Sequence, residues 1–222
     1  MVLWFMTEPL KKLEEMHEKD KRKLSEAEQR RLEKYERLSE DLIRQGYTRT
    51  ELIVDIKKAN VFAIVLLIPL FIVGYGLYAL INHSIAFPDN LLLTIIAILV
   101  LVVVHELIHG LCWSLFTPNH FKDIEFGIMM PMVTPYCTCL VPLSKGQHIF
   151  GTVMPLVILG IIPMIAGAFL ASPYLMFIGI IMADAAAGDI LIIFRLLGYK
   201  SKAREIVYMD HPTEAGGVIF EK

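Results

Sequence analysis

Long runs of apolar residues limit what this chain can fold into. Residues 61–81, VFAIVLLIPLFIVGYGLYALI, contain no charged side chain. A helix needs about 20 such residues to cross the hydrocarbon core of a bilayer, so this run is long enough for one span. Comparable runs cover residues 91–116, 150–171 and 173–197, and 55% of the 222 residues are hydrophobic. The sequence therefore predicts a mainly α-helical, polytopic membrane protein with about four transmembrane helices.

Charged residues gather in the first 60 positions, which carry 14 of the 21 Lys and Arg and 13 of the 23 Asp and Glu. Apolar residues recur there at near-helical spacing, and Ser25 followed by Glu28 is a capping-box signature. We expect residues 1–45 to form a charged N-terminal arm of one or two surface helices, which could bind a cytoplasmic partner. Because its basic and acidic residues nearly cancel, no nucleic-acid partner is expected.

The positions of Lys and Arg predict how the chain is oriented in the membrane. The expected loops 82–90 and 171–174 contain neither residue, whereas 117–149 and both terminal segments contain them. Loops on the cytoplasmic side carry an excess of Lys and Arg. We therefore expect both termini and the middle connection to be cytoplasmic. Thr48 and Glu51 form a second capping-box signature, which predicts a helix that leads into the first span.

Residues 121–149 differ from the apolar runs. The stretch KDIEFGIMM partly alternates between apolar and polar residues, and Pro131, Pro135 and Pro142 exclude a regular helix. This pattern predicts a small β-hairpin or a re-entrant segment against the membrane domain. Irregular backbone at membrane depth must be covered by protein or line a wet cavity.

A cluster of ionisable residues interrupts the second apolar run. His105, Glu106 and His109 form the pattern H-E-x-x-H. Histidines at positions i and i+4 of a helix share one face, so both imidazoles can bind one Zn²⁺. Glu106 is then placed to take a proton from water at the metal and to pass it to a leaving amine. Ionisable groups inside membrane helices usually mark a functional site, and the spans contain no Lys or Arg near Glu106 that could neutralise it.

A catalytic zinc takes three protein ligands, so a third residue is needed. Asp184 and Asp189 are the acidic residues of the fourth apolar run. At 1.5 Å per residue, Asp189 lies about 24 Å from the outer end of its span, between His105 at about 21 Å and His109 at about 27 Å. Asp184 lies higher, at about 16 Å. We predict Asp189 as the third ligand, with Asp184 as the alternative.

The cysteines give weaker signals. Cys112 lies three residues after His109 and could reach the same site, although a buried thiol more often only packs. Cys137 and Cys139 could bind a metal together with His148, but a lone Cys-x-Cys pair is a weak pattern. An odd number of cysteines does not indicate a disulfide framework. The roles of these residues stay open.

Four segments together resemble a known family: HELIHG, FKDIEFGIMM with YCTCLVPL, GTVMPLVILG and AAAGDILIIFRLL. They are similar to the membrane zincin peptidases, a family of domain-of-unknown-function type related to the site-2 proteases, over roughly residues 46–220. The resemblance implies that His105, His109 and Asp189 hold zinc, that Glu106 is the acid and base, and that cleavage occurs inside the bilayer toward the cytoplasm. The segment DAAAGDI lacks the Asn, Pro and Asp-Gly arrangement of the site-2 proteases.

The expected organisation is a charged extension over 1–45, a metalloprotease-like membrane domain over 46–200 and a cytoplasmic tail over 201–222. The predicted function is that of an integral-membrane zinc metalloprotease, which hydrolyses membrane-embedded or membrane-adjacent polypeptides. An extended substrate could pair with an edge of the hairpin. Two alternatives stay open: a non-catalytic membrane metal-binding scaffold, and a small ion or metal transporter whose acidic residues line a path.

Overall fold

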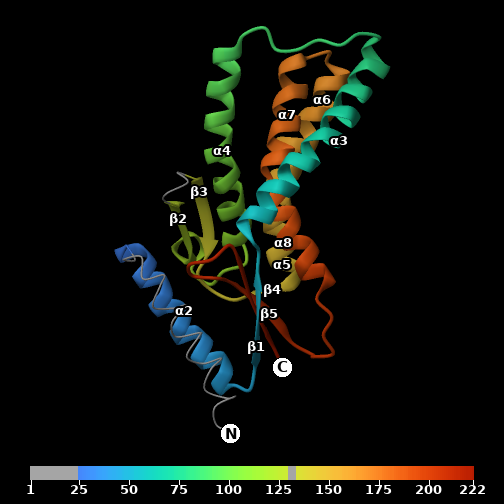
Figure 1. The fold of residues 1–222 in the computed structure, drawn as a ribbon. Coiled ribbons are helices and arrows are strands. Elements are labelled where there is room, and N and C mark those ends of the chain that lie inside the picture. Colours follow the sequence, from blue (N-terminus) through green and yellow to red (C-terminus); the bar gives the residue numbers. More distant parts are fainter. Residues whose placement is uncertain (1–24, 130–133) are drawn as a thin grey trace, which may run out of the picture.

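The computed structural model describes residues 25–129 and 134–222 (Figure 1). Helices dominate this part of the chain, which confirms the predicted mainly α-helical class. The helices are α2 (Glu26–Arg44), α3 (Ile56–Asn82), α4 (Leu91–Ser114), the 3₁₀ turn η1 (His120–Asp123), α5 (Lys145–Pro155), the π-helical segment η2 (Leu156–Ile161), α6 (Ile162–Phe169), α7 (Pro173–Ala185) and α8 (Ala187–Gly198).

Among the described residues, three helices are long and apolar enough to cross a membrane: α3, α4 and the continuous helix made of α5, η2 and α6. Helices α7 and α8 form a fourth span if they are counted together. The four apolar runs of the sequence therefore fold as expected, with one difference. The fourth run is not one straight helix, because α7 and α8 meet at Ala186 with a bend of 47°.

The connections between the long helices fall into two groups, one at each end of the helices. The segments joining α3 to α4 and α6 to α7 lie at one end of the helices, whereas α2 and the strands gather toward the other end (Figure 1). The segments expected in the cytoplasm thus share one end of the spans.

A four-stranded antiparallel sheet lies at this second end, in the order β1-β6-β5-β4. Its strands are β1 (Thr48–Ile53), β4 (Leu143–Ser144), β5 (Ile206–Asp210) and β6 (Gly216–Glu221). The helix predicted from the Thr48 and Glu51 signature is wrong, because both residues pair with β6. Helix α3 begins later and is capped by Asp55, whose side chain accepts hydrogen bonds from the next backbone N–H groups. Residues 201–222, expected as a cytoplasmic tail, supply strands β5 and β6. The sheet therefore pairs this segment with β1 near position 50.

Helix α2 confirms the helical character of the charged arm within the described residues. The predicted capping box is present, since the Ser25 side chain accepts from the Glu28 N–H and Glu28 accepts from the Ser25 N–H. Tyr35 is buried against Met209 and Phe220, so α2 packs on the sheet. Any helix before residue 25 lies outside the described residues.

The predicted β-hairpin is present as β2 (Ile124–Met129) and β3 (Thr134–Cys139), which pair antiparallel. It lies along α4 (Figure 1). Ile124 joins a buried cluster with Trp113 of α4. The Phe126 ring covers Gly110, where a Cβ would lie 2.3 Å from that ring, so this glycine allows the hairpin to approach α4 closely.

Candidate metal centre

The two histidines of the H-E-x-x-H pattern share one face of α4, as their spacing predicts. Both side chains are buried, and their ring centroids are 4.8 Å apart. The turn of helix between them is regular, because the run around them consists of helix-compatible apolar residues. Their imidazoles are therefore available as a pair on the side of α4 that faces the other helices.

Asp189 completes the group from the first turn of α8. Its Oδ2 lies 3.0 Å from His105 Nε2 and 3.4 Å from His109 Nε2. In the part of the chain that the structure describes, these three residues form the group of His, Cys, Asp or Glu side chains whose ligand atoms all lie within 4.8 Å of one another. Atoms bound tetrahedrally at about 2.0–2.1 Å from zinc lie about 3.3–3.4 Å apart. Two imidazole nitrogens and one carboxylate oxygen at this spacing fit a catalytic zinc site.

Hydrogen bonding orients one of these rings. His109 Nδ1 lies 2.9 Å from the backbone carbonyl oxygen of Gly151 on α5. A carbonyl only accepts hydrogen bonds, so Nδ1 donates to Gly151, and Nε2 faces Asp189, where the neutral ring can offer its lone pair to a metal. Such a partner on the far nitrogen is the usual support of a metal-binding histidine. Nδ1 of His105 is buried and has no hydrogen-bond partner among the described residues.

Glu106 lies beside the three candidate ligands and is partly exposed. It lies next to the backbone of Cys137 on β3, so the hairpin approaches it closely. Glu106 also lines a groove of about 320 Å³ between α4 and the hairpin. The other residues that line this groove are mostly apolar: Val103, Leu107, Phe126, Gly127, Ile128, Pro135 and Tyr136. A ligand in the groove would therefore meet a carboxylate at an otherwise apolar wall.

Asp184, the alternative third ligand, lies on α7 and does not join this group. Its Oδ1 is buried and has no hydrogen-bond partner among residues 25–129 and 134–222. Between the two aspartates, Ala186 and Ala187 are buried. The geometry thus favours Asp189, although its role as a ligand stays a prediction.

The structure places the weaker candidate ligands, the cysteines and His148, outside the group of three. Cys112 packs in an apolar cluster with Leu159 and Met182. Among the described residues, the ligand atoms of Cys137, Cys139 and His148 do not come close enough together to form a metal site. Burial raises the pKa of both hairpin thiols, that of Cys139 to about 12.

A second buried network supports the centre, and the sequence did not reveal it. The Trp113 ring stacks on His109 at 5.1 Å and on His148 at 5.2 Å, and its Nε1–H donates to the His148 carbonyl. His148 Nε2 lies 3.1 Å from Asp210 of β5. Asp210 also accepts from the backbone N–H of Cys139 at 2.8 Å. Side chains thus connect the metal-facing histidine to the hairpin and the sheet.

Residues 98–204 match the model of the family DUF3267, whose description reads "Putative zincin peptidase". This segment, just under half of the chain, is similar to that family. The matched range is shorter than the expected 46–220, but it contains Glu106 and all three candidate ligands. The family implies zinc as the cofactor and supports a metallopeptidase. No curated protein and no solved structure matches the chain significantly.

Proposed function

We propose that this protein is an integral-membrane zinc metalloprotease that hydrolyses peptide bonds of membrane-embedded or membrane-adjacent polypeptides. The observation that carries the proposal is the placement of Asp189 Oδ2 at 3.0 and 3.4 Å from the two H-E-x-x-H histidines. The family match supports the zinc peptidase chemistry. The length and apolar character of the helices that hold the site support a membrane setting.

Each residue of the centre has a distinct role in this mechanism. His105, His109 and Asp189 would hold the metal, and Gly151 keeps His109 in the binding tautomer. Zinc, when bound, supplies a Lewis acid that polarises the scissile carbonyl and makes water easier to deprotonate. Glu106 accepts the proton of the attacking water and delivers it to the departing nitrogen.

The groove beside Glu106 is the proposed place of the substrate. Its apolar walls suit an apolar polypeptide segment, and its position between α4 and the hairpin puts that segment next to the carboxylate. The backbone of the hairpin offers hydrogen-bonding groups to an extended chain. A substrate helix would have to unwind locally first, because the amides of an intact helix are hydrogen-bonded and covered.

The proposed orientation places α2, the sheet and the hairpin in or near the cytoplasm. The sequence supports this by its Lys and Arg distribution. The structure supports it because these segments gather toward one end of the long helices (Figure 1). The metal centre then lies in the cytoplasmic half of the spans, close to the strands.

The test is a cleavage assay with the full chain in detergent and in liposomes, using a set of labelled single-span polypeptides. The wild type should contain zinc and release fragments, and a chelator should stop the release. The His105→Ala variant should contain no zinc and release none. A wild type that binds zinc but cleaves no member of the set would contradict the proposal and favour a metal-binding scaffold.

A further inference from the structure

The β2–β3 hairpin is a layer between two helices, and its alternating side chains contact both. Ile124 and Phe126 face α4, where they meet Trp113 and Gly110. Glu125, between them in sequence, pairs instead with Arg31 of α2 at 3.5 Å. Successive side chains of a strand point to opposite faces, so α2 and α4 cover the two faces of the hairpin.

Arg31 is buried to a degree that is unusual for an arginine, with 9% of its side chain exposed. Its guanidinium carbon lies 4.6 Å from the centroid of the Tyr136 ring on β3. Its Nε has no hydrogen-bond partner among the described residues. Removing an arginine from water is costly unless it gains charge pairs or aromatic contacts, and here it gains both from the hairpin.

A second pair fixes the same helix to the start of the hairpin. Lys34 Nζ lies 3.2 Å from Asp123 Oδ1, and that carboxylate is almost fully buried. Burial alone would raise the pKa of Asp123, but hydrogen bonds from Asn119 and Lys34 hold it below its ordinary value. This buried carboxylate is thus charged and bound to α2 at neutral pH.

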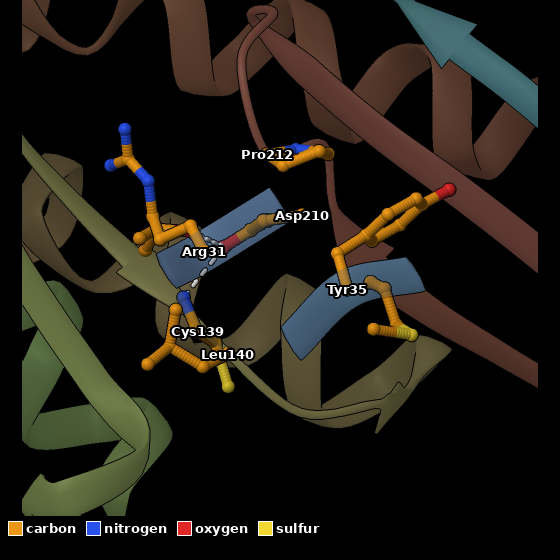
Figure 2. A pocket seen from close by; sticks show the side chains of 8 residues that line it. Arg31, Tyr35, Cys139, Leu140, Asp210 and Pro212 are labelled. Atoms are coloured by element: carbon orange, nitrogen blue, oxygen red, sulfur yellow. Dashed lines mark hydrogen bonds between the residues drawn. The ribbon is translucent and has the colours of Figure 1, made fainter. Parts of the chain in front are cut away.

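Figure 2 shows Arg31 and Tyr35 of α2 around the same pocket as Cys139 and Leu140 at the base of the hairpin. Arg31 and Tyr35 line a cavity of about 10 Å³ together with Cys139, Leu140 and Asp210. That volume admits about one water molecule, so α2 fits closely on this surface. Asp210, which also lines this cavity, accepts a hydrogen bond from the Cys139 N–H (Figure 2). The base of the hairpin is therefore held from α2 and from the sheet.

Tyr136 connects this contact to the candidate active site. It is stacked under Arg31 on one side and lines the groove that also contains Glu106. Its ring lies over Gly127, where a Cβ would be 2.4 Å from the Tyr136 hydroxyl, so the ring has little freedom to move toward its partner strand. A change at Arg31 can therefore reach the groove through one residue, whose ring faces α2 and which also lines the groove.

We propose that α2 is part of the substrate-binding apparatus, and that Arg31 is a positioning residue that holds Tyr136 and the hairpin against α4, so that the groove accepts an extended polypeptide segment. This inference rests on the proposed protease function. It assigns the charged arm a role inside the enzyme, in addition to any role in recruiting partners. Arg31 acts through Tyr136 and does not touch the reacting atoms.

The test compares Arg31→Ala with Arg30→Ala in the full-length protein. Arg30 is the neighbouring arginine of α2, but it is 69% exposed, and among the described residues its ion pair is with Glu26 of the same helix. Arg31→Ala should raise KM for a polypeptide substrate roughly threefold to thirtyfold, the range expected for a lost cation–π contact. It should leave kcat and zinc content nearly unchanged, and Arg31→Lys should restore part of the loss. Arg30→Ala should behave like the wild type.

A second measurement follows the hairpin without any cleavage. In a Cys112→Ala, Cys139→Ala background, Cys137 is the remaining thiol, and it lies on β3 against Glu106. Arg31→Ala should increase its alkylation rate at least threefold, and Arg30→Ala should not.

The outcomes separate the two proposals. Equal KM and equal alkylation in Arg31→Ala and the wild type would overturn the role of Arg31 while the protease function stands. Faster alkylation with unchanged KM would also overturn it, because the hairpin would then move without consequence for the substrate. A parallel fall of kcat, zinc content and melting temperature would show a merely structural role. No cleavage by the wild type would overturn the protease function and the inference that rests on it.

Discussion

His109 and Gly151 meet through a hydrogen bond of 2.9 Å between the Nδ1 of the imidazole and the backbone carbonyl. The residue that supplies this carbonyl has no side chain for a specific reason. A Cβ at position 151 would lie 2.1 Å from the indole ring of Trp113, which stacks on His109. One glycine therefore orients the histidine and leaves room for the ring that packs against it.

Gly151→Ala should weaken both folding and metal binding. The added methyl must displace Trp113 or α5, which typically costs about 1–3 kcal/mol of stability. A shift of α5 would move the residue 151 carbonyl away from His109, and the weakened hydrogen bond should reduce zinc affinity roughly tenfold to a hundredfold. Thermal melting and zinc titration check these values. Gly146→Ala on the same helix is the control, because a Cβ there meets no atom within 4 Å. An unchanged Gly151→Ala protein would contradict the close packing of Trp113.

His105→Ala and His109→Ala should each lose the metal. The wild type should carry about one zinc per chain, since three ligands gather at one place. Elemental analysis of the purified proteins measures this directly. His83→Asn is the matched control, because His83 is exposed at the end of α3 with a φ of 51°, a conformation that asparagine tolerates. Equal zinc content in the wild type and all three variants would contradict the assignment of these histidines as zinc ligands.

Asp189→Asn should weaken zinc binding and abolish cleavage, whereas Asp184→Asn should do much less. Only Asp189 lies within 3.4 Å of both histidine Nε2 atoms. Asp184 has a buried, unpartnered oxygen, so its neutral variant should be as stable as the wild type or slightly more stable. Zinc affinity and melting temperature of the two variants provide the comparison. The reverse ranking would transfer the ligand role to Asp184.

The candidate centre could be predicted because its signals are local or follow from helix geometry. The spacing of His105 and His109 fixes a shared face whatever the rest of the fold does. The depth argument for Asp189 assumed one straight fourth helix, and the structure bends it at Ala186. That bend lies three residues before Asp189, so it shifts this residue by no more than about 4.5 Å along the span. The error in the estimated depth of Asp189 was therefore too small to make Asp184 the better candidate ligand.

The sheet could not be predicted, because its pairings join residues far apart in the sequence. Thr48 pairs with Glu221, and the local Thr-x-x-Glu pattern pointed to a helix cap instead. Strand pairing decided the outcome, since β1 gains its hydrogen bonds from β6. The contact between His148 and Asp210 was hidden for the same reason. No sequence pattern around His148 or Asp210 indicates that the two residues are in contact.

The orientation can be tested by labelling two exposed positions with a membrane-impermeant thiol reagent. We expect Ser84→Cys to react from outside the cell and Lys202→Cys to react only after the membrane is opened, because Lys and Arg favour the cytoplasmic side. Both residues are exposed. The native cysteines are replaced by alanine in each variant. Labelling of position 202 from outside would reverse the proposed topology.

Glu106→Gln should keep the metal and the fold yet stop cleavage. Glutamine has nearly the same volume, and Glu106 is outside the group of three candidate ligands, so the histidines and Asp189 should still bind zinc. The amide cannot accept a proton from water and pass it to the departing nitrogen. General acid–base groups contribute about 10²–10⁴-fold, so cleavage should fall at least about a hundredfold.

Asp184→Asn controls for the loss of one negative charge inside the apolar helices, and it should retain activity. Zinc content, melting temperature and cleavage in liposomes are compared for the three proteins. Full cleavage by Glu106→Gln would exclude the proposed mechanism, and loss of its zinc would show that Glu106 has a structural or ligand role.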